Sequence, residues 1–294
     1  MVDNNKIYHF LINLFLAVLA FFCIMPFILL ITSSFTEEYT LVRDGYSFFP
    51  KTLSLASYQY IFSGSSKILR GYGMTVIVTA IGTLTNILMT TLLAYPLAQR
   101  TLPGRNAISF YVFFTMLFNG GIVPQYMLWS NFFHIKNTIF ALLVPNLLMG
   151  AFYIIMMRSY FTSNIPEALG EAARIDGAGE FRILFKIVMP ISKPMVATLG
   201  LMAGLAYWND WINGLYYITN EKMFTMQNIL NRMLQDAQFL TTGGALNVGD
   251  LVRNTPLNGI KMAIAVVGVI PILIIYPFIQ KYLVQGITVG AVKG

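Results

Sequence analysis

Long apolar runs dominate this chain and determine the medium in which it can fold. Apolar residues make up 56% of its 294 residues and charged residues only 11%, whereas soluble domains carry about 25% charged residues. Such a small number of ionised side chains cannot cover the surface of a soluble globular protein. We therefore expect the chain to lie in lipid. Because a spanning helix needs roughly 20 mostly apolar residues, the sequence predicts six spans, at 10–35, 73–97, 108–129, 138–157, 194–218 and 262–279.

The predicted fold is therefore an all-α, polytopic membrane protein with six transmembrane helices. A single transmembrane domain covers residues 1–294, with two long external loops at 36–72 and 219–261 and a polar, mixed-charge island at 164–190. Prolines such as Pro26, Pro96 and Pro145 predict kinks, which are tolerated where neighbouring helices satisfy the freed carbonyls.

Lysine and arginine in the short loops predict the orientation. The short loop on the opposite side from the island holds only Lys136. The island side carries Arg100 and Arg105 in one loop and five further cations in or beside the island: Arg158, Arg174, Arg182, Lys186 and Lys193. We therefore expect the island and both termini to be cytoplasmic.

The island itself predicts two short helices. Asn164 is placed to cap the first, whose opening turn holds Pro166 and Glu167, and Gly177 is placed to end it after Asp176. The second, Glu180–Met189, brings Phe181, Leu184, Phe185 and Val188 onto one face before Pro190 ends it. The small residues of the first helix suit the groove of a soluble partner, and the second would brace it; the alternative is an amphipathic connector on the membrane.

The island also carries a specifically spaced motif. Glu171-Ala172-Ala173 is followed by Gly177, Ile187 and Pro190. This pattern resembles the EAA signature of permease subunits of bacterial ABC importers, with Met189 where the family usually has leucine before the last proline. Further segments are similar to the carbohydrate branch of that family, the maltose-permease G type: 45–62, 93–100, 208–211 and 286–294.

The resemblance implies a type I ABC importer fold in a bacterial plasma membrane. The implied partners are a second, homologous permease, a cytoplasmic ATPase dimer that binds the ATP and Mg, and an external sugar-binding protein; the chain itself would carry no cofactor. The island becomes a coupling helix that docks on the ATPase. The implied ATPase-coupling residues are Glu171, Ala172, Ala173, Arg174, Gly177, Ile187 and Pro190.

The resemblance also bears on the cargo, which is expected to be an oligosaccharide. Phe118-Asn119-Gly120-Gly121, with Pro124 and Tyr126, resembles the subgroup associated with aldouronate, rhamnogalacturonan and alginate systems. The sequence names neither the sugar nor its length.

Asp210 is the one acidic residue inside a predicted span, and an ionisable group at that depth is a candidate functional site. Aromatic rings can stack on sugars while amides and carboxylates bind hydroxyls. The substrate-pathway candidates are Trp208, Asn209, Asp210, Trp211, Asn86 and Asn119. The alternative is structural: tryptophans form interfacial belts, and Asp210 can act as a hydrogen-bond hub.

Three classes of function fit the residues less well than an ABC importer permease does. The chain lacks a G-x-x-x-x-G-K-[ST] loop, an H-E-x-x-H motif and a serine nucleophile elbow, so it is not expected to be an enzyme, and no catalytic or metal site is predicted. A secondary transporter would need ion-coupling residues and often internal repeats, yet Asp210 stands alone. A purely structural membrane subunit would not explain the island. An ABC importer permease is the favoured class.

Overall fold

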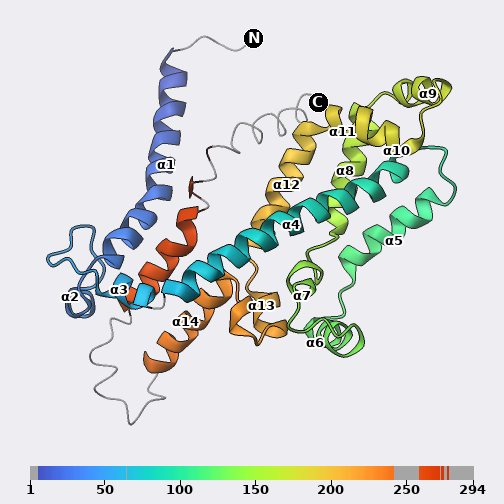
Figure 1. The fold of residues 1–294 in the computed structure, drawn as a ribbon. Helices are drawn as coiled ribbons and strands as arrows, with labels where there is room; N and C mark the ends of the chain where they lie inside the picture. Colours follow the sequence, from blue (N-terminus) through green and yellow to red (C-terminus); the bar gives the residue numbers. More distant parts are fainter. Residues whose placement is uncertain (1–5, 64, 242–257, 272, 275–276, 278–294) are drawn as a thin grey trace. The chain divides into compact units, whose positions relative to one another are not determined.

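The computed structural model describes residues 6–63, 65–241, 258–271, 273–274 and 277 (Figure 1). Over these residues the secondary structure is helical, apart from one isolated antiparallel bridge between Thr36 and Leu53. The end of the predicted sixth span, the middle of the second external loop and the motif at 286–294 lie outside the described residues. The all-helical prediction is confirmed for the described part of the chain.

Two helices are each long and apolar enough to cross a membrane: Tyr8–Ser34 with 27 residues and Lys67–Ala98 with 32. Two bent pairs pass the same test when joined, Arg105–Leu117 with Ile122–Phe132 (113°) and Glu180–Ile191 with Lys193–Trp208 (86°). These give up to four crossings among the described residues. The count of six stays a prediction.

One compact unit comprises residues 1–68 and 230–273. Its helices are α1 (Lys6–Ser34), α2 (Glu38–Asp44), α3 (Ala56–Ser63), most of α14 (Met226–Thr241) and the helix Asn258–Pro271. The Glu38 carboxylate accepts hydrogen bonds from the backbone N–H groups of Asn258 (3.0 Å) and Gly259 (2.9 Å). These groups lack partners within a helix, so Glu38 of α2 caps the helix Asn258–Pro271.

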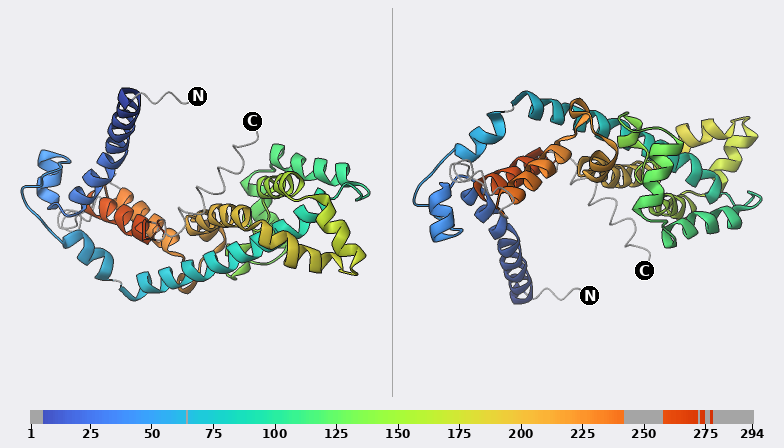
Figure 2. Two further views of the ribbon diagram at one scale, coloured as in Figure 1. Left: turned by 90° about the horizontal axis from the view of Figure 1, so that it is seen from above. Right: turned by 90° about the horizontal axis from the view of Figure 1, so that it is seen from below.

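The other unit comprises residues 69–229 and 274–294. Its elements are α4 (Ser65–Ala98, which begins in the first unit), α5 (Arg105–Leu117), α6 (Ile122–Met127), the π-helix η1 (Leu128–Phe132), α7 (Phe140–Leu143), α8 (Ala151–Asn164), α9 (Glu167–Ile175), α10 (Glu180–Ile183), the π-helix η2 (Leu184–Val188), α11 (Met189–Ile191), α12 (Lys193–Trp208), α13 (Ile212–Tyr217) and the 3₁₀ turn η3 (Glu221–Met223). Within it α5 and α8 lie side by side (Figure 1, Figure 2). Helices α9–α11 lie at one end and α6, α7 and α13 at the other (Figure 1).

Small residues set the contact between α4 and α12 in this unit. A Cβ atom added at Gly82 would lie 2.5 Å from the Tyr207 ring, and one at Gly204 would lie 3.4 Å from the Thr83 hydroxyl. Small residues at an interface let helix backbones approach closely. Gly204 therefore belongs to tight packing within the bundle.

Three predicted spans are interrupted rather than continuous. The span at 108–129 bends between α5 and α6, the span at 138–157 unwinds over 144–150, and the span at 194–218 breaks between α12 and α13. The unwinding at 144–150 contains Pro145, whose ring cannot continue a helix, and Asn146 with φ +62°. The sequence predicts a kinked helix at Pro145, whereas in the structure the helix is fully interrupted there.

Neighbouring helices satisfy the backbone of the unwound segment. The Tyr207 hydroxyl donates to the Leu143 carbonyl (2.8 Å), Asn213 Nδ2 to the Pro145 carbonyl (3.0 Å) and Asn86 Nδ2 to the Leu147 carbonyl (2.7 Å). Unpaired carbonyls are costly in a membrane interior, and non-helical backbone persists there only where protein or water satisfies it. The expectation that neighbours satisfy carbonyls freed near Pro145 is confirmed.

Candidate functional site

The predicted docking helix exists as α9, but it begins differently from the prediction. Its N-cap is Pro166, in extended conformation. Asn164 instead belongs to the last turn of α8, where its Nδ2 donates to the Tyr160 carbonyl (3.2 Å). The predicted Asn164 cap is therefore wrong, because α8 extends to Asn164 and α9 begins only at Glu167.

Helix α9 ends as the sequence predicts. Gly177 has φ +79°, in the left-handed region that favours glycine. Its N–H donates to the Arg174 carbonyl (3.0 Å), and the Ala178 N–H donates to the Ala173 carbonyl (2.9 Å). This pair of bonds is a Schellman motif, which closes a helix on a left-handed residue. Gly177 is therefore required by the turn itself.

The motif residues divide between two sides of α9. Glu171, Ala172 and Gly177 are exposed, whereas Ala173 is only 8% exposed and packs in the hydrophobic core of its own chain. Sequence reasoning missed Ile175, which is 87% exposed on the same helix. A large apolar side chain left this exposed marks a candidate protein contact. Its only sequence signal is an isoleucine beside charged residues.

The bracing segment departs from the predicted single amphipathic helix. It consists of α10, the π-helix η2 and α11. Ile183, Leu184 and Val188 are buried, whereas Phe181 (71% exposed) and Phe185 (44%) face outward. The two phenylalanines lie four positions apart, as do Leu184 and Val188, so the buried face of the segment is rotated away from the predicted one. The placement of both phenylalanines on the packed face is corrected.

The two remaining motif positions lie in this segment. Ile187 is half-buried against the core that Ala173 shares, and Pro190 is exposed within α11. The helical stretch runs on to Ile191 before the 86° bend, so Pro190 does not end it.

A hydrogen-bonded network joins α9 to the long helix α4. Glu180, at the start of α10, accepts from Arg174 Nε of α9 (Oε1, 2.7 Å) and from the Tyr95 hydroxyl of α4 (Oε2, 2.6 Å). Arg174 Nη2 also reaches the Gln99 side-chain oxygen (3.5 Å). Hydrogen bonding by Arg174 and then Tyr95 holds the pKa of the Glu180 carboxyl below its ordinary value. We call Tyr95, Arg174 and Glu180 the coupling triad.

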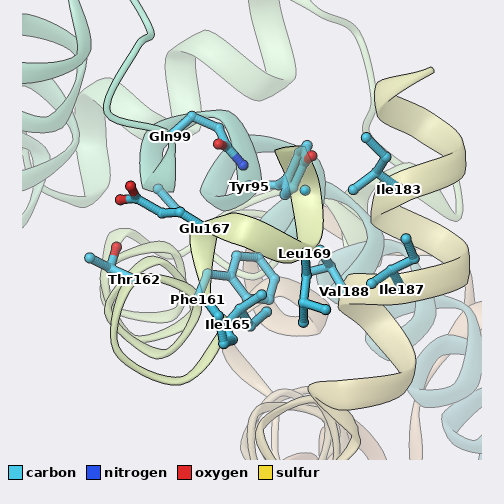
Figure 3. Close-up of a pocket in the computed structure, with 13 residues that line it drawn as sticks. Tyr95, Gln99, Phe161, Thr162, Ile165, Glu167, Leu169, Ile183, Ile187 and Val188 are labelled. Carbon is cyan, nitrogen blue, oxygen red and sulfur yellow. The ribbon is translucent and has the colours of Figure 1, made fainter. Parts of the chain in front are cut away.

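Apolar side chains from several helices meet beneath α9 (Figure 3). They come from α4 (Tyr95), α8 (Phe161, Ile165) and the bracing segment (Ile183, Val188), and they line a cavity of about 40 Å³. A single water needs roughly 10–15 Å³, so this space is a packing seam too small for a nucleotide or sugar. Within the described residues no group of three His, Cys, Asp or Glu side chains gathers as a metal site.

Asp210 lies at the break between α12 and α13. Its Oδ1 accepts hydrogen bonds from the backbone N–H groups of Ile212 and Asn213, both at 3.2 Å. Trp208 is buried at 8% exposure, Trp211 is 39% exposed, and the side chain of exposed Asn209 donates to the Leu205 carbonyl. Asp210 thus caps the short helix α13, as its structural interpretation requires, and sugar contact by this group stays a prediction.

The two asparagine candidates have different surroundings. Asn86 is fully buried and holds the Leu147 carbonyl. Asn119 is exposed after α5, and its Oδ1 accepts from the Gly121 N–H (2.9 Å) and from Gln125 Nε2 (3.3 Å). The structure therefore places Asn86 in the helix packing and Asn119 on the surface.

We predict that Asp210→Ala destabilises the chain whereas Asp210→Asn does not. Asparagine keeps an oxygen for the two N–H groups of α13, and losing such a cap costs about 1 kcal/mol. The thermal midpoint of the detergent-purified protein measures this effect. A midpoint equally lowered in both variants would show that the negative charge, rather than the cap, matters.

The comparisons with known proteins agree with this architecture. Residues 91–289 match the family of binding-protein-dependent transport system inner membrane components. The protein LplC of Bacillus subtilis (strain 168) is 35% identical over 96% of this chain and 93% of its own length. The polygalacturonan/rhamnogalacturonan transport system permease protein YtcP of the same strain is 35% identical over 99% of this chain and 100% of its own. The chain belongs to this family, as its EAA motif predicted.

A solved structure shares the fold. A chain of a bacterial ABC transporter involved in the import of the acidic polysaccharide alginate superposes with a TM-score of 0.78, at 28% identity, over 96% of this chain and 98% of that one. The helical permease fold of an ABC importer is therefore shown.

Proposed function

We propose that this chain is one of two permease subunits of a binding-protein-dependent ABC importer that brings an acidic oligosaccharide into the cytoplasm. The observation that carries the proposal is the likeness, over nearly the whole chain, to the polygalacturonan/rhamnogalacturonan permease YtcP and to the alginate transporter. Both of those proteins handle polymers of acidic sugars. The Phe118-Asn119-Gly120-Gly121 motif supports the same substrate class.

The proposed topology has six spans in the bacterial plasma membrane, with both termini and α9 in the cytoplasm. The cations that flank α9 support this orientation. An ATPase dimer would bind ATP and Mg, and α9 would dock in a groove of one ATPase subunit through Glu171, Ala172 and Gly177, with Ile175 as an apolar anchor. A homologous permease and an external sugar-binding protein complete the assembly.

The proposed mechanism is alternating access. ATP binding closes the ATPase pair and moves α9; Arg174 and Glu180 carry the movement to Tyr95 on α4, and the packed core that contains Ala173 carries it to α8 and η2. Packed helices with ionic contacts can shift as units between two arrangements. The cavity between the two permeases then opens toward the docked binding protein.

Uptake by the complete transporter tests the proposal. Proteoliposomes that hold both permeases and the ATPase are expected to accumulate labelled trigalacturonate when loaded binding protein is outside and ATP inside. Uptake without ATP, driven by an ion gradient instead, would favour a secondary transporter. A structural membrane subunit predicts unchanged uptake when this chain is omitted.

A further inference from the structure

Three helices of the second unit end at a similar depth. Counted from the end of the unit that holds α9, α5 has 13 residues, α8 has 14 and α12 has 16. At 1.5 Å per residue they reach only about 20 to 24 Å, whereas the hydrocarbon core is about 30 Å thick. In the proposed topology the ends of these helices that lie away from α9, and the breaks next to those ends, are therefore in the outer half of the membrane.

Three side-chain amides form a chain across two of these breaks. Asn146, in the unwound segment, donates from Nδ2 to Gln125 Oε1 (3.2 Å), and Gln125 of α6 donates from Nε2 to Asn119 Oδ1 (3.3 Å). Among the described residues, Asn119 Nδ2 and Asn146 Oδ1 have no protein partner, and both residues are exposed. The chain thus ends in one free donor group and one free acceptor.

Such amides cannot face lipid at low cost. Transfer of an amide to an apolar medium without a hydrogen bond costs roughly 2–7 kcal/mol, and polar groups in spans face the bundle interior or a water-filled cavity. The carbonyls at 143, 145 and 147 are satisfied by protein. The free donor and acceptor at the two ends of the amide chain are not used by the fold, and they point to a hydrated surface.

A cation contacts the residue that follows Gln125 in α6. Lys136 Nζ lies 3.4 Å from the Tyr126 hydroxyl and 6.0 Å from the centre of its ring, and Tyr126 follows Gln125 in α6. Within the described part of the chain, Lys136 has no carboxylate within ion-pair distance, whereas Arg174 is paired with Glu180. An exposed ammonium without a protein counter-charge attracts anions.

We propose that Asn119, Gln125, Asn146 and Lys136 form a binding surface for an acidic oligosaccharide on the outer half of the transport path. This inference rests on the proposed function and assigns residues to its substrate. The free amide donor and acceptor bind sugar hydroxyls, and Lys136 binds a uronate carboxylate. The exposed ring of Phe118, which stacks on Phe114 at 4.2 Å, stands beside Asn119 for a sugar ring. The carboxylate of Asp210 is partly compensated by the two α13 N–H groups.

Cysteine labelling tests whether the surface faces water and sugar. The chain has one cysteine, Cys23, so Asn119→Cys and Asn146→Cys are made in a Cys23→Ser background and assembled into the complete transporter in nanodiscs. A water-soluble maleimide is expected to label both positions, and trigalacturonate on its binding protein to slow the reaction severalfold. The control Val112→Cys, 7% exposed on α5, is expected to stay unlabelled.

Substitution of Lys136 tests the charge. At saturating loaded binding protein, Lys136→Gln is expected to lower trigalacturonate uptake about tenfold, the effect of removing a hydrogen bond to a charged group. Lys136→Arg keeps the positive charge and is expected to retain uptake.

Two results would overturn the inference: no labelling at Asn119→Cys and Asn146→Cys, or labelling without protection together with normal uptake in Lys136→Gln. Failure of the proposed function looks different, because the unsubstituted transporter would then show no ATP-dependent trigalacturonate uptake at all.

Discussion

Gly177→Trp is expected to abolish sugar uptake while the chain still inserts and folds. Gly177 closes α9 at φ +79°, and a Cβ added there meets no atom within 4 Å. The indole would therefore project from the exposed end of α9 into the space that the ATPase must occupy. The strain of a non-glycine residue in this conformation is only about 1–2 kcal/mol. Uptake, and co-purification with the ATPase, measure the effect.

Gly45 provides a matched control. It has φ +78° and also meets no atom within 4 Å, but it lies in the loop predicted to be external, where the ATPase cannot reach. Gly45 has ψ −168°, a region that strains a non-glycine residue at least as much as the conformation of Gly177 does, and Gly45→Trp is expected to leave ATPase co-purification intact. If Gly177→Trp kept normal uptake, α9 would not be the docking helix; if both variants lost the ATPase, strain would be the cause.

The second large effect is expected at the coupling triad. Glu180→Gln removes the charge that binds Arg174 and Tyr95 together, which weakens the hydrogen-bonded link from α9 to Tyr95 of α4. ATP hydrolysis should persist, because the exposed face of α9 is unchanged, while sugar imported per ATP hydrolysed falls about tenfold, as for the loss of one or two charged hydrogen bonds. The ratio of uptake to hydrolysis in proteoliposomes measures this uncoupling.

An exposed ion pair nearby serves as the control for the triad. Arg100 and Glu167 are 2.8 Å apart with side chains 73% and 58% exposed, and such pairs contribute about 0–1 kcal/mol. In the coupling triad Arg174 is 38% and Glu180 54% exposed, so the difference under test is the hydrogen bond that Glu180 also accepts from Tyr95. Glu167→Gln is expected to leave the uptake ratio unchanged. The exchange Arg174→Glu with Glu180→Arg should restore part of the coupling. Equal ratios in Glu180→Gln and the unsubstituted protein would remove the triad from the mechanism.

Local rules predicted the parts of the fold that depend on neighbours in sequence. The end of α9 follows from a glycine after a helical run, and α1 and α4 follow from long, mainly apolar runs. The predicted cap at Asn164 is wrong because Asn164 lies in the last turn of α8 and α9 begins only at Glu167. Phe181 and Phe185 were misplaced because the apolar period alone does not show which apolar positions pack against the core, where Ile183 and Leu184 lie instead.

The candidate site depends more on contacts distant in sequence. The EAA residues were found from spacing alone, yet Glu180 is joined to Tyr95, 85 positions away, and no local pattern indicates that bond. The break at 144–150 is stabilised by Asn86, Tyr207 and Asn213, which come from other elements. Hydropathy contains no information about these contacts and therefore predicts a continuous span. Asn119 was found from its motif, but its link to Asn146 required the fold.

The central claim is that this chain transmits the work of a partner ATPase to an acidic sugar. Its most direct test is ATP hydrolysis by the purified complex of this chain, its sister permease and the ATPase, with and without trigalacturonate-loaded binding protein. We predict stable co-purification and severalfold stimulation by the loaded binding protein. A chain that elutes alone beside well-folded partners, or a complex whose hydrolysis ignores the loaded binding protein, would contradict the account.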